Sequence, residues 1–190
     1  MENSLNEIIE QIECVSPDQT AIEFQNKNFD KPFLLMAIKG SHHKLLIYDE
    51  TLDMTQIAEI LYAIRGHKVY ISSFEVNEDY QQNGIGRLLF NIAATHGDIE
   101  NATFIYGDAD PINNIKGVSD KEGVTFEDEQ QTIFKIYQKL GCIVNPETHG
   151  FYQVWKYGDK LKHADPFVKN IATILAEKDG FSLTEQNQPQ

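Results

Sequence analysis

The sequence predicts an α/β fold in which a mixed central sheet carries helices on both faces. Two patterns favour this fold class. Three strand-like runs follow one another early in the chain, separated by short polar segments, as in an antiparallel meander. Further along, strand-like runs alternate with segments whose apolar residues recur at helix spacing. With 190 residues, of which 41% are hydrophobic, the chain has the size and composition of one globular domain.

Strands are expected where β-branched and aromatic residues gather between turn residues. Asn28 and Asp30 separate the first two runs, and Gly40 and Ser41 separate the second from the third. The expected strands are residues 21–24, 33–38, 44–48, 68–76, 103–106, 143–144 and 151–155.

Helices are expected where apolar residues form one stripe. Gly66 and Gly141 follow two of these stripes as helix ends, and Thr125 with Asp128 fits a capping box. The expected helices are residues 5–12, 53–64, 85–93, 125–140 and 166–178, and residues 184–190 are expected to form a disordered tail.

The charge of the chain limits its partners. The formal net charge is −13, and affinity for nucleic-acid backbones comes mainly from Lys and Arg, so nucleic acid is not an expected partner. An acidic surface attracts cationic substrates, but it also serves solubility alone, and both interpretations stay open.

No membrane or metal signal is present in the sequence. No run reaches the roughly 20 apolar residues of a membrane helix, and the first residues do not resemble a signal peptide. Cys14 and Cys142 are far apart, so reduced thiols are expected, with a single disulfide as the alternative. Among six histidines only His42 and His43 are adjacent, and no metal site is expected. We therefore expect a cytoplasmic protein without a membrane partner.

A glycine-containing turn between a strand and a helix carries the strongest chemical signal. Gly84 and Gly86 lack side chains, so the backbone there can approach a ligand closely. The N–H groups and dipole at the start of the next helix favour a diphosphate, and Arg87 adds a cation. A purely structural turn is the alternative. The run lacks the third glycine of a dinucleotide fingerprint and the Gly-Lys-Ser/Thr of a P-loop.

Two segments together resemble a known family. Residues 74–89 closely resemble the acetyl-CoA signature of the Gcn5-related N-acetyltransferase (GNAT) superfamily, whose Gln/Arg-x-x-Gly-x-Gly/Ala core is matched by Gln81, Gly84 and Gly86. Residues 136–142 resemble the helix-to-strand segment of that family, usually Tyr-x-Lys-x-Gly-Phe. The resemblance covers roughly residues 68–155. It implies a mixed, mostly antiparallel sheet with helices on both faces and acetyl-CoA as co-substrate.

The resemblance also assigns roles to residues. Tyr137 is implied as the acid that protonates the departing thiolate, with a core tyrosine as the alternative. Glu75, or a water that it holds, is the expected base, and an exposed strand carboxylate is its alternative. The implied cofactor contacts are Phe74, Glu75, Val76, Gln81, Gln82, Asn83, Gly84, Ile85, Gly86 and Arg87.

The expected domain is single and spans residues 1–183. Residues 1–67 form its divergent part, 68–157 its cofactor core and 164–178 its last helix. The chain departs from the family pattern at Gln130, where Asn is usual, and at Cys142, where Phe is usual. It also departs in the position of the helix expected at 53–64 and in the long loop 108–125.

The predicted function is N-acetyl transfer to a primary amine. The alternatives are a module that binds CoA without turnover and a non-catalytic interaction protein. The acceptor is expected to be a small cationic amine or a peptide amine, with Asp108 and Asp110 in the loop as its expected contacts. The aromatic residues Phe151, Tyr152 and Trp155 are expected to belong either to the core of the sheet or to a homodimer contact.

Overall fold

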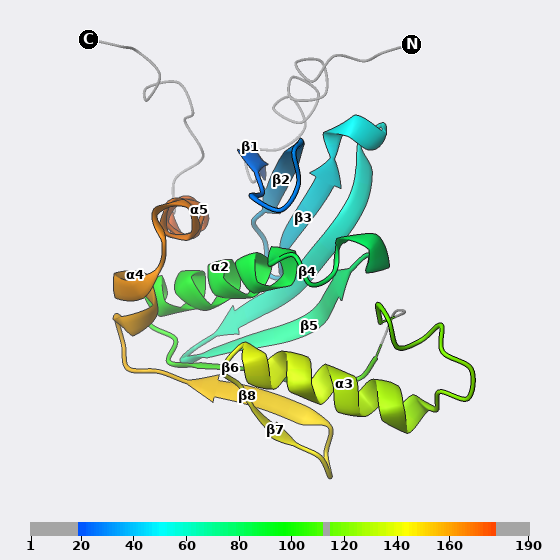
Figure 1. Cartoon of the computed structure of the whole chain (residues 1–190). Coiled ribbons are helices and arrows are strands. Elements are labelled where there is room, and N and C mark those ends of the chain that lie inside the picture. Colours follow the sequence, from blue (N-terminus) through cyan, green and yellow to red (C-terminus); the bar gives the residue numbers. More distant parts are fainter. Residues whose placement is uncertain (1–18, 112–114, 178–190) are drawn as a thin grey trace.

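A computed structural model describes residues 19–111 and 115–177 as a sheet with helices packed against it (Figure 1). The sheet has eight strands in the order β1-β2-β3-β4-β5-β6-β8-β7. All neighbouring strands are antiparallel except β5 and β6, which run parallel. The predicted mixed, mostly antiparallel sheet is confirmed. The helix expected at 5–12, Cys14 and the tail expected at 184–190 lie outside the described residues.

Most of the expected elements are present within a few residues of their expected bounds. The strands are β1 (Gln19–Gln25), β2 (Pro32–Ile38), β3 (His43–Asp49), β4 (Thr55–Arg65), β5 (Lys68–Val76), β6 (Phe104–Asp108), β7 (Ile143–Asn145) and β8 (Gly150–Val154). The α-helices are α2 (Ile85–Ile99), α3 (Phe126–Lys139), α4 (Asp159–His163) and α5 (Pro166–Ala176), and the 3₁₀ turns are η1 (Glu50–Leu52) and η2 (Glu78–Tyr80). The capping box of Thr125 and Asp128 at the start of α3 is confirmed.

The helix expected at residues 53–64 is wrong, because this segment forms strand β4. β4 pairs with β3 on one side and with β5 on the other. Gly66, with φ of 58°, lies in the two-residue turn of the β4–β5 hairpin and does not end a helix. A glycine in the left-handed conformation is common both after a helix and in a hairpin turn, so Gly66 could not distinguish the two structures.

The main core lies on one face of the sheet. Phe33, Ile60 and Ile105 belong to one buried cluster, together with residues of α2, α3 and α5. Strand register places Phe151 of β8 on the same face as Gly107 of β6, and Phe151 is the residue on which α3 packs. Of the described helices, α2, α3 and α5 all pack on this face, and the helix expected at 5–12 lies outside the described residues.

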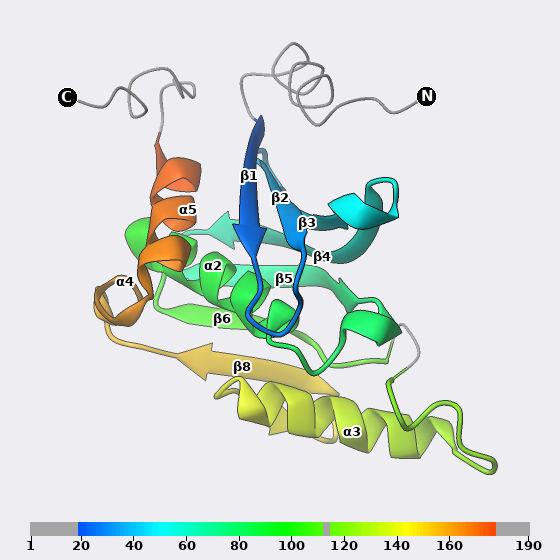
Figure 2. The same ribbon diagram turned by 45° about the horizontal axis from the view of Figure 1, so that its top comes forward.

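Helix α2 lies at the centre of the molecule, between α5 and strands β4 and β5 (Figure 2). A Cβ atom at Gly97 would lie 2.2 Å from a methyl of Val69, so glycine allows α2 to approach β5 closely. The buried Asp98 accepts hydrogen bonds from the backbone N–H groups of Gly158 (2.7 Å) and Leu161 (2.9 Å). These bonds attach α4, which the sequence did not predict, to α2.

Candidate functional site

The parallel strands β5 and β6 separate at the site. Their ladder begins at Lys68–Phe104 and ends at Ile71–Gly107, but β5 continues to Val76 along β4. A bulge near Ser72 shifts the alternation, so that Phe74 and Val76 face α2 and Glu75 faces the other side of the sheet. The strand that carries the predicted pantetheine contacts therefore diverges from its parallel neighbour.

The predicted phosphate turn lies at the end of this diverging strand. Gly84 has φ of 84° and occupies the N-cap position of α2, where no side chain caps the helix. A left-handed conformation is costly for other residues and ordinary for glycine. At Gly86 a Cβ atom would meet the Phe74 ring at 3.3 Å and Val76 at 3.5 Å. Gly84 thus permits the turn, and Gly86 permits α2 to start close against β5.

One large cavity brings most of the predicted site residues together. Its volume is about 1650 Å³, and it extends from the β1–β2 loop past the α2 turn to α3. The predicted residues along it are Phe74, Glu75, Val76, Gln81, Gln82, Asn83, Gly84, Gly86, Arg87, Asp108, Asp110 and Tyr137. Ile85 is the exception, because its side chain is fully buried in the core and only its backbone belongs to the turn.

The charge of this cavity differs from that of the whole chain. The chain has 16 Lys and Arg against 29 Asp and Glu. The cavity lining, in contrast, holds five cationic residues, Lys27, Arg87, Lys116, Lys135 and Lys139, and five acidic residues, Glu23, Glu75, Asp108, Asp110 and Asp165. Together with the positive end of the α2 dipole, these cations favour an anion in this region.

Tyr137 of α3 also lines the large cavity. Its ring stacks on Phe151 with the centroids 3.8 Å apart, and it meets Phe74 edge-on at 6.3 Å. Its side chain is 6% exposed. Burial raises the pKa of Tyr137, and the negative charge of Asp108 raises it further, so the hydroxyl stays protonated at neutral pH. A protonated hydroxyl beside a cavity is suited to donate a proton.

Glu75 borders two cavities. It lines the large one and also a smaller hollow of about 660 Å³. Five of the ten residues around this hollow are acidic and none is basic: Gln56, Ile57, Ala58, Glu59, Glu75, Asn77, Glu78, Asp79, Pro111 and Glu129. Glu75 thus connects an acidic opening to the cavity that holds the glycine turn.

The two expected acceptor residues have different surroundings. Asp108 ends β6 near Tyr137, as its effect on the tyrosine pKa indicates. Asp110 pairs with His149, whose Nδ1 lies 3.0 Å from its carboxylate. Gln130, the departure from the family pattern, is 4% exposed and donates its amide to the carbonyl of Ala109. It therefore anchors the loop after β6 to α3.

Several site residues were not anticipated from the sequence. Asn26 and Asn28 both donate side-chain hydrogen bonds to the carbonyl of Asn83, each at 3.0 Å. Lys27, between them, lines the large cavity. Of these three residues, the sequence analysis used only Asn28, as part of a polar separator between strands. No local motif distinguishes such a loop, because its partners are more than 50 positions away.

Neither a metal cluster nor a membrane-spanning helix is found in the part of the chain that the structure describes. Within residues 19–111 and 115–177, no three His, Cys, Asp or Glu side chains are grouped so as to hold a metal ion. Over the same ranges, no helix has the length and apolar character needed to cross a membrane. Cys142 is buried as a free thiol, and burial raises its pKa to about 12.

Comparison with solved structures identifies the fold. No protein-family model matches the sequence, and no curated protein matches it. A mutant of the cAMP-binding acyltransferase from Mycobacterium smegmatis aligns with 93% of this chain at a TM-score of 0.59 and 13% identity. The non-mutant form aligns with 92% of the chain at a TM-score of 0.57 and 12% identity. The chain has the GNAT acyltransferase fold. It spans 62% and 61% of the lengths of these two structures.

A weaker match is to a protein whose name places it in the GNAT family. An acetyltransferase of the GNAT family from Staphylococcus aureus MU50 aligns at a TM-score of 0.44 and 13% identity, over 61% of this chain and 69% of its own.

Proposed function

We propose that this chain is an acetyl-CoA-dependent N-acetyltransferase that transfers the acetyl group to a primary amine by direct attack in a ternary complex. One observation carries the proposal: the diverging end of β5, the glycine turn of α2 and Tyr137 border a single cavity. The GNAT fold and the acyltransferase activity named for its structural neighbours support it.

The cofactor would bind with its diphosphate at the first turn of α2. The first N–H groups of an α-helix have no partner within the helix, and Gly84 lets a ligand approach them. Arg87 and the neighbouring lysines offset the negative field of the chain locally. The pantetheine arm would then extend along Phe74, Glu75 and Val76 toward Tyr137.

The reaction requires a neutral amine. A primary amine with a pKa of about 10.4 is mostly protonated at neutral pH and must first lose a proton. Glu75, or a water that it holds, is the base in this proposal, because it lies between the acidic hollow and the cofactor cavity. The nitrogen lone pair then attacks the thioester carbonyl carbon, and the π electrons of the C=O bond move to the oxygen. Backbone N–H groups stabilise the resulting oxyanion.

Collapse of this intermediate breaks the C–S bond. The oxyanion reforms the carbonyl, the thiolate leaves with the bonding pair, and Tyr137 supplies its proton. The second nitrogen proton is then lost to restore Tyr137, directly or through water. The products are the N-acetyl amine and the free thiol of CoA. The position of Tyr137 supports this role, because it borders the cavity together with Phe74, Glu75 and Val76. The raised pKa does not add to this support, since a tyrosine is protonated at neutral pH at its ordinary pKa of about 10.

The acidic hollow supports a cationic acceptor. Its carboxylates would attract an ammonium group, and it meets the cofactor cavity at Glu75. A small di- or polyamine, or an exposed peptide amine, would fit this chemistry. Asp108 and Asp110 line the large cavity and remain the proposed contacts for a remote ammonium group.

The test combines binding and turnover. Calorimetry should detect acetyl-CoA binding, and a thiol-release assay over a panel of cationic, neutral and anionic amines should show turnover with cationic ones. Binding without turnover on any amine would favour a regulatory CoA-binding module. Absence of binding would favour a structural glycine turn and contradict the proposal. Exchange of Asp108 and Asp110 for Asn should lower kcat/KM for cationic acceptors while leaving acetyl-CoA affinity unchanged.

A further inference from the structure

We infer that the β1–β2 loop, residues 26–31, is part of the cofactor site and positions the phosphate turn of α2. This inference rests on the proposed function, and it assigns the loop to recognition of the diphosphate part of the cofactor. Figure 2 shows the loop beside the start of α2, although the two are more than 50 residues apart in sequence.

The first contact lies at the turn itself. The side-chain amides of Asn26 and Asn28 both donate to the Asn83 carbonyl, at 3.0 Å each. That carbonyl shares one peptide unit with the N–H of Gly84. Because the peptide unit is planar, fixing the direction of the carbonyl also fixes the direction of this N–H. The Gly84 N–H points away from the loop and is a proposed phosphate donor.

The two amides also act electrostatically. Hydrogen bonds that share a peptide unit polarise one another, so two donors on the carbonyl make the N–H a stronger donor. The loop is itself held in shape, since the Asn28 N–H donates to the Asn26 side chain at 2.8 Å and the Phe29 N–H to the Asn26 carbonyl at 2.9 Å. Asn26 and Asn28 are therefore positioning residues for the turn.

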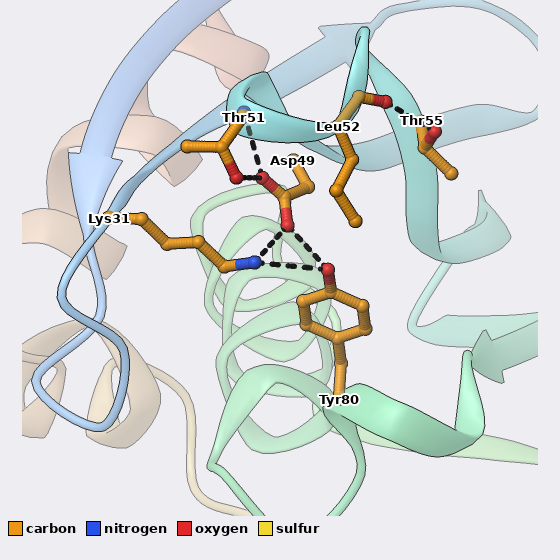
Figure 3. Close-up of polar contacts among 6 residues, drawn as sticks. All are labelled: Lys31, Asp49, Thr51, Leu52, Thr55 and Tyr80. Carbon is orange, nitrogen blue, oxygen red and sulfur yellow. Dashed lines mark hydrogen bonds and ion pairs between the residues drawn. The ribbon is translucent and has the colours of Figure 1, made fainter.

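The second contact anchors the far end of the loop. Lys31 forms an ion pair with the fully buried Asp49 and donates to the Tyr80 hydroxyl at 3.2 Å (Figure 3). Tyr80 ends η2, directly before the turn, and donates to the same carboxylate oxygen as Lys31. Thr51 donates to the other oxygen through its N–H (2.9 Å) and its hydroxyl (2.7 Å).

This polar cluster is stable as an ion pair. Burial would raise the pKa of Asp49, but hydrogen bonds from Lys31, Tyr80 and Thr51 outweigh it and lower the pKa to about 2. The Lys31 ammonium also lies 5.0 Å from the centroid of the Tyr80 ring and 5.8 Å from that of Phe33. The loop thus contacts both ends of segment 80–83, Asn83 through Asn26 and Asn28 and Tyr80 through Lys31. Lys27, which lines the large cavity, lies at the Asn26–Asn28 end of the loop.

The test separates the phosphate part of the cofactor from its pantetheine arm. The double variant Asn26→Leu and Asn28→Leu keeps side-chain size and removes both donors, and Gln131→Leu on the exposed face of α3 is the matched control. Binding of acetyl-CoA, of ADP and of phosphate-free S-acetyl-pantetheine would be measured by calorimetry or ligand-observed NMR.

We expect the double variant to bind acetyl-CoA and ADP at least about fivefold more weakly, since a hydrogen bond contributes about 1 kcal/mol. S-acetyl-pantetheine should bind within twofold of wild type, and the control should bind all three ligands normally. Equal weakening for all three ligands, or none, would overturn the inference. Wild type that binds none would overturn the proposed function as well. If the double variant fails to fold, the single variant Asn28→Leu, at an exposed position, supplies the same comparison.

Discussion

At the scale of single residues, Tyr137 both packs in the core and lines the cavity. Tyr137 had two competing interpretations in the sequence, a core tyrosine and a proton donor. In the structure it is buried and stacked on Phe151, and it also borders the cavity. Both interpretations therefore describe its position, and only turnover can assign its hydroxyl a role.

The first prediction concerns this hydroxyl. Tyr137→Phe keeps the ring that stacks on Phe151 and removes only the oxygen. We expect kcat to fall at least about tenfold, as for loss of a general acid, with acetyl-CoA affinity unchanged. Steady-state kinetics and calorimetry together check this. Normal turnover would make Tyr137 a core residue, and a parallel loss of affinity would assign it to binding.

The second prediction compares two neighbouring carboxylates. Glu75 and Glu59 face each other across β5 and β4, and both line the acidic hollow, but of the two Glu75 alone also lines the large cavity. Glu75→Gln should lower kcat/KM for a cationic amine at least about tenfold, because the base is lost. Glu59→Gln should lower it much less. Similar losses in both variants would indicate a shared electrostatic effect and no base at Glu75.

At the scale of elements, the sequence predicted those with a local signal and missed a strand that is defined by its pairing with distant segments. The strand–turn–helix order around Gly84 was predictable, since glycine, polar turn and apolar stripe follow one another locally. Strand β4 was not, because Ile57, Ile60, Leu61 and Ile64 have the spacing of a helix stripe. A strand that is buried on both faces and bulged against its neighbours loses the simple alternation that identifies strands.

The same argument explains what was missed at the site. The glycine turn could be predicted from its own residues, whereas its support by Asn26 and Asn28 depends on tertiary contacts. A short polar turn between two strands looks the same whether or not it touches a distant segment. The Asp49 cluster was missed for the same reason, since its partners come from three separate segments (Figure 3).

The third prediction tests the contact between α2 and β5. Gly97→Ala places a methyl 2.2 Å from a Val69 methyl, which forces the helix and strand apart. We expect a loss of about 1–3 kcal/mol in the free energy of unfolding, despite the better helix propensity of alanine. Urea denaturation measures it. Adding Val69→Ala should restore part of the loss, and a stable single variant would show that the contact is looser than described.

At the scale of the whole molecule, one core on one face of the sheet supports a cavity at the end of that face. The core extends from Phe33 on β2 to Phe151 on β8, and α2 crosses its centre. Buried polar groups lie within it, including Tyr62, whose hydroxyl lies 2.8 Å from Nδ1 of His96. The ring of His43 packs against His96 at 4.7 Å. These histidines make stability depend on pH.

The fourth prediction follows from these pKa shifts. Burial, with Lys39 and neighbouring histidines, lowers the pKa of His43 to about 4 and of His96 to about 3. The unfolded chain binds these protons near pH 6.5, so it gains protons first as pH falls. Stability should therefore decrease from pH 6.5 toward pH 4, by up to about 1.4 kcal/mol per pH unit for each histidine.

Urea titrations between pH 7 and pH 4 would measure this slope. His96→Gln should flatten it, and His163→Gln, at an exposed position on α4, should not. The Asp49 cluster contributes little above about pH 5, because a carboxyl with a lowered pKa loses its stabilising effect progressively as pH falls from about 5 toward the lowered pKa. A slope that is unchanged in the His96 variant would contradict the assignment.

The central claim, that acetyl-CoA binds at the first turn of α2, is tested most directly by calorimetry on three proteins. Arg87→Glu reverses an exposed charge beside the turn, and Arg65→Glu makes the same change of net charge at an exposed position outside both cavities. We predict that wild type and Arg65→Glu bind acetyl-CoA within twofold of each other and that Arg87→Glu binds at least about tenfold more weakly, as expected for loss of a charge-assisted contact. Absence of binding in wild type, or equal affinity in all three proteins, would contradict the account.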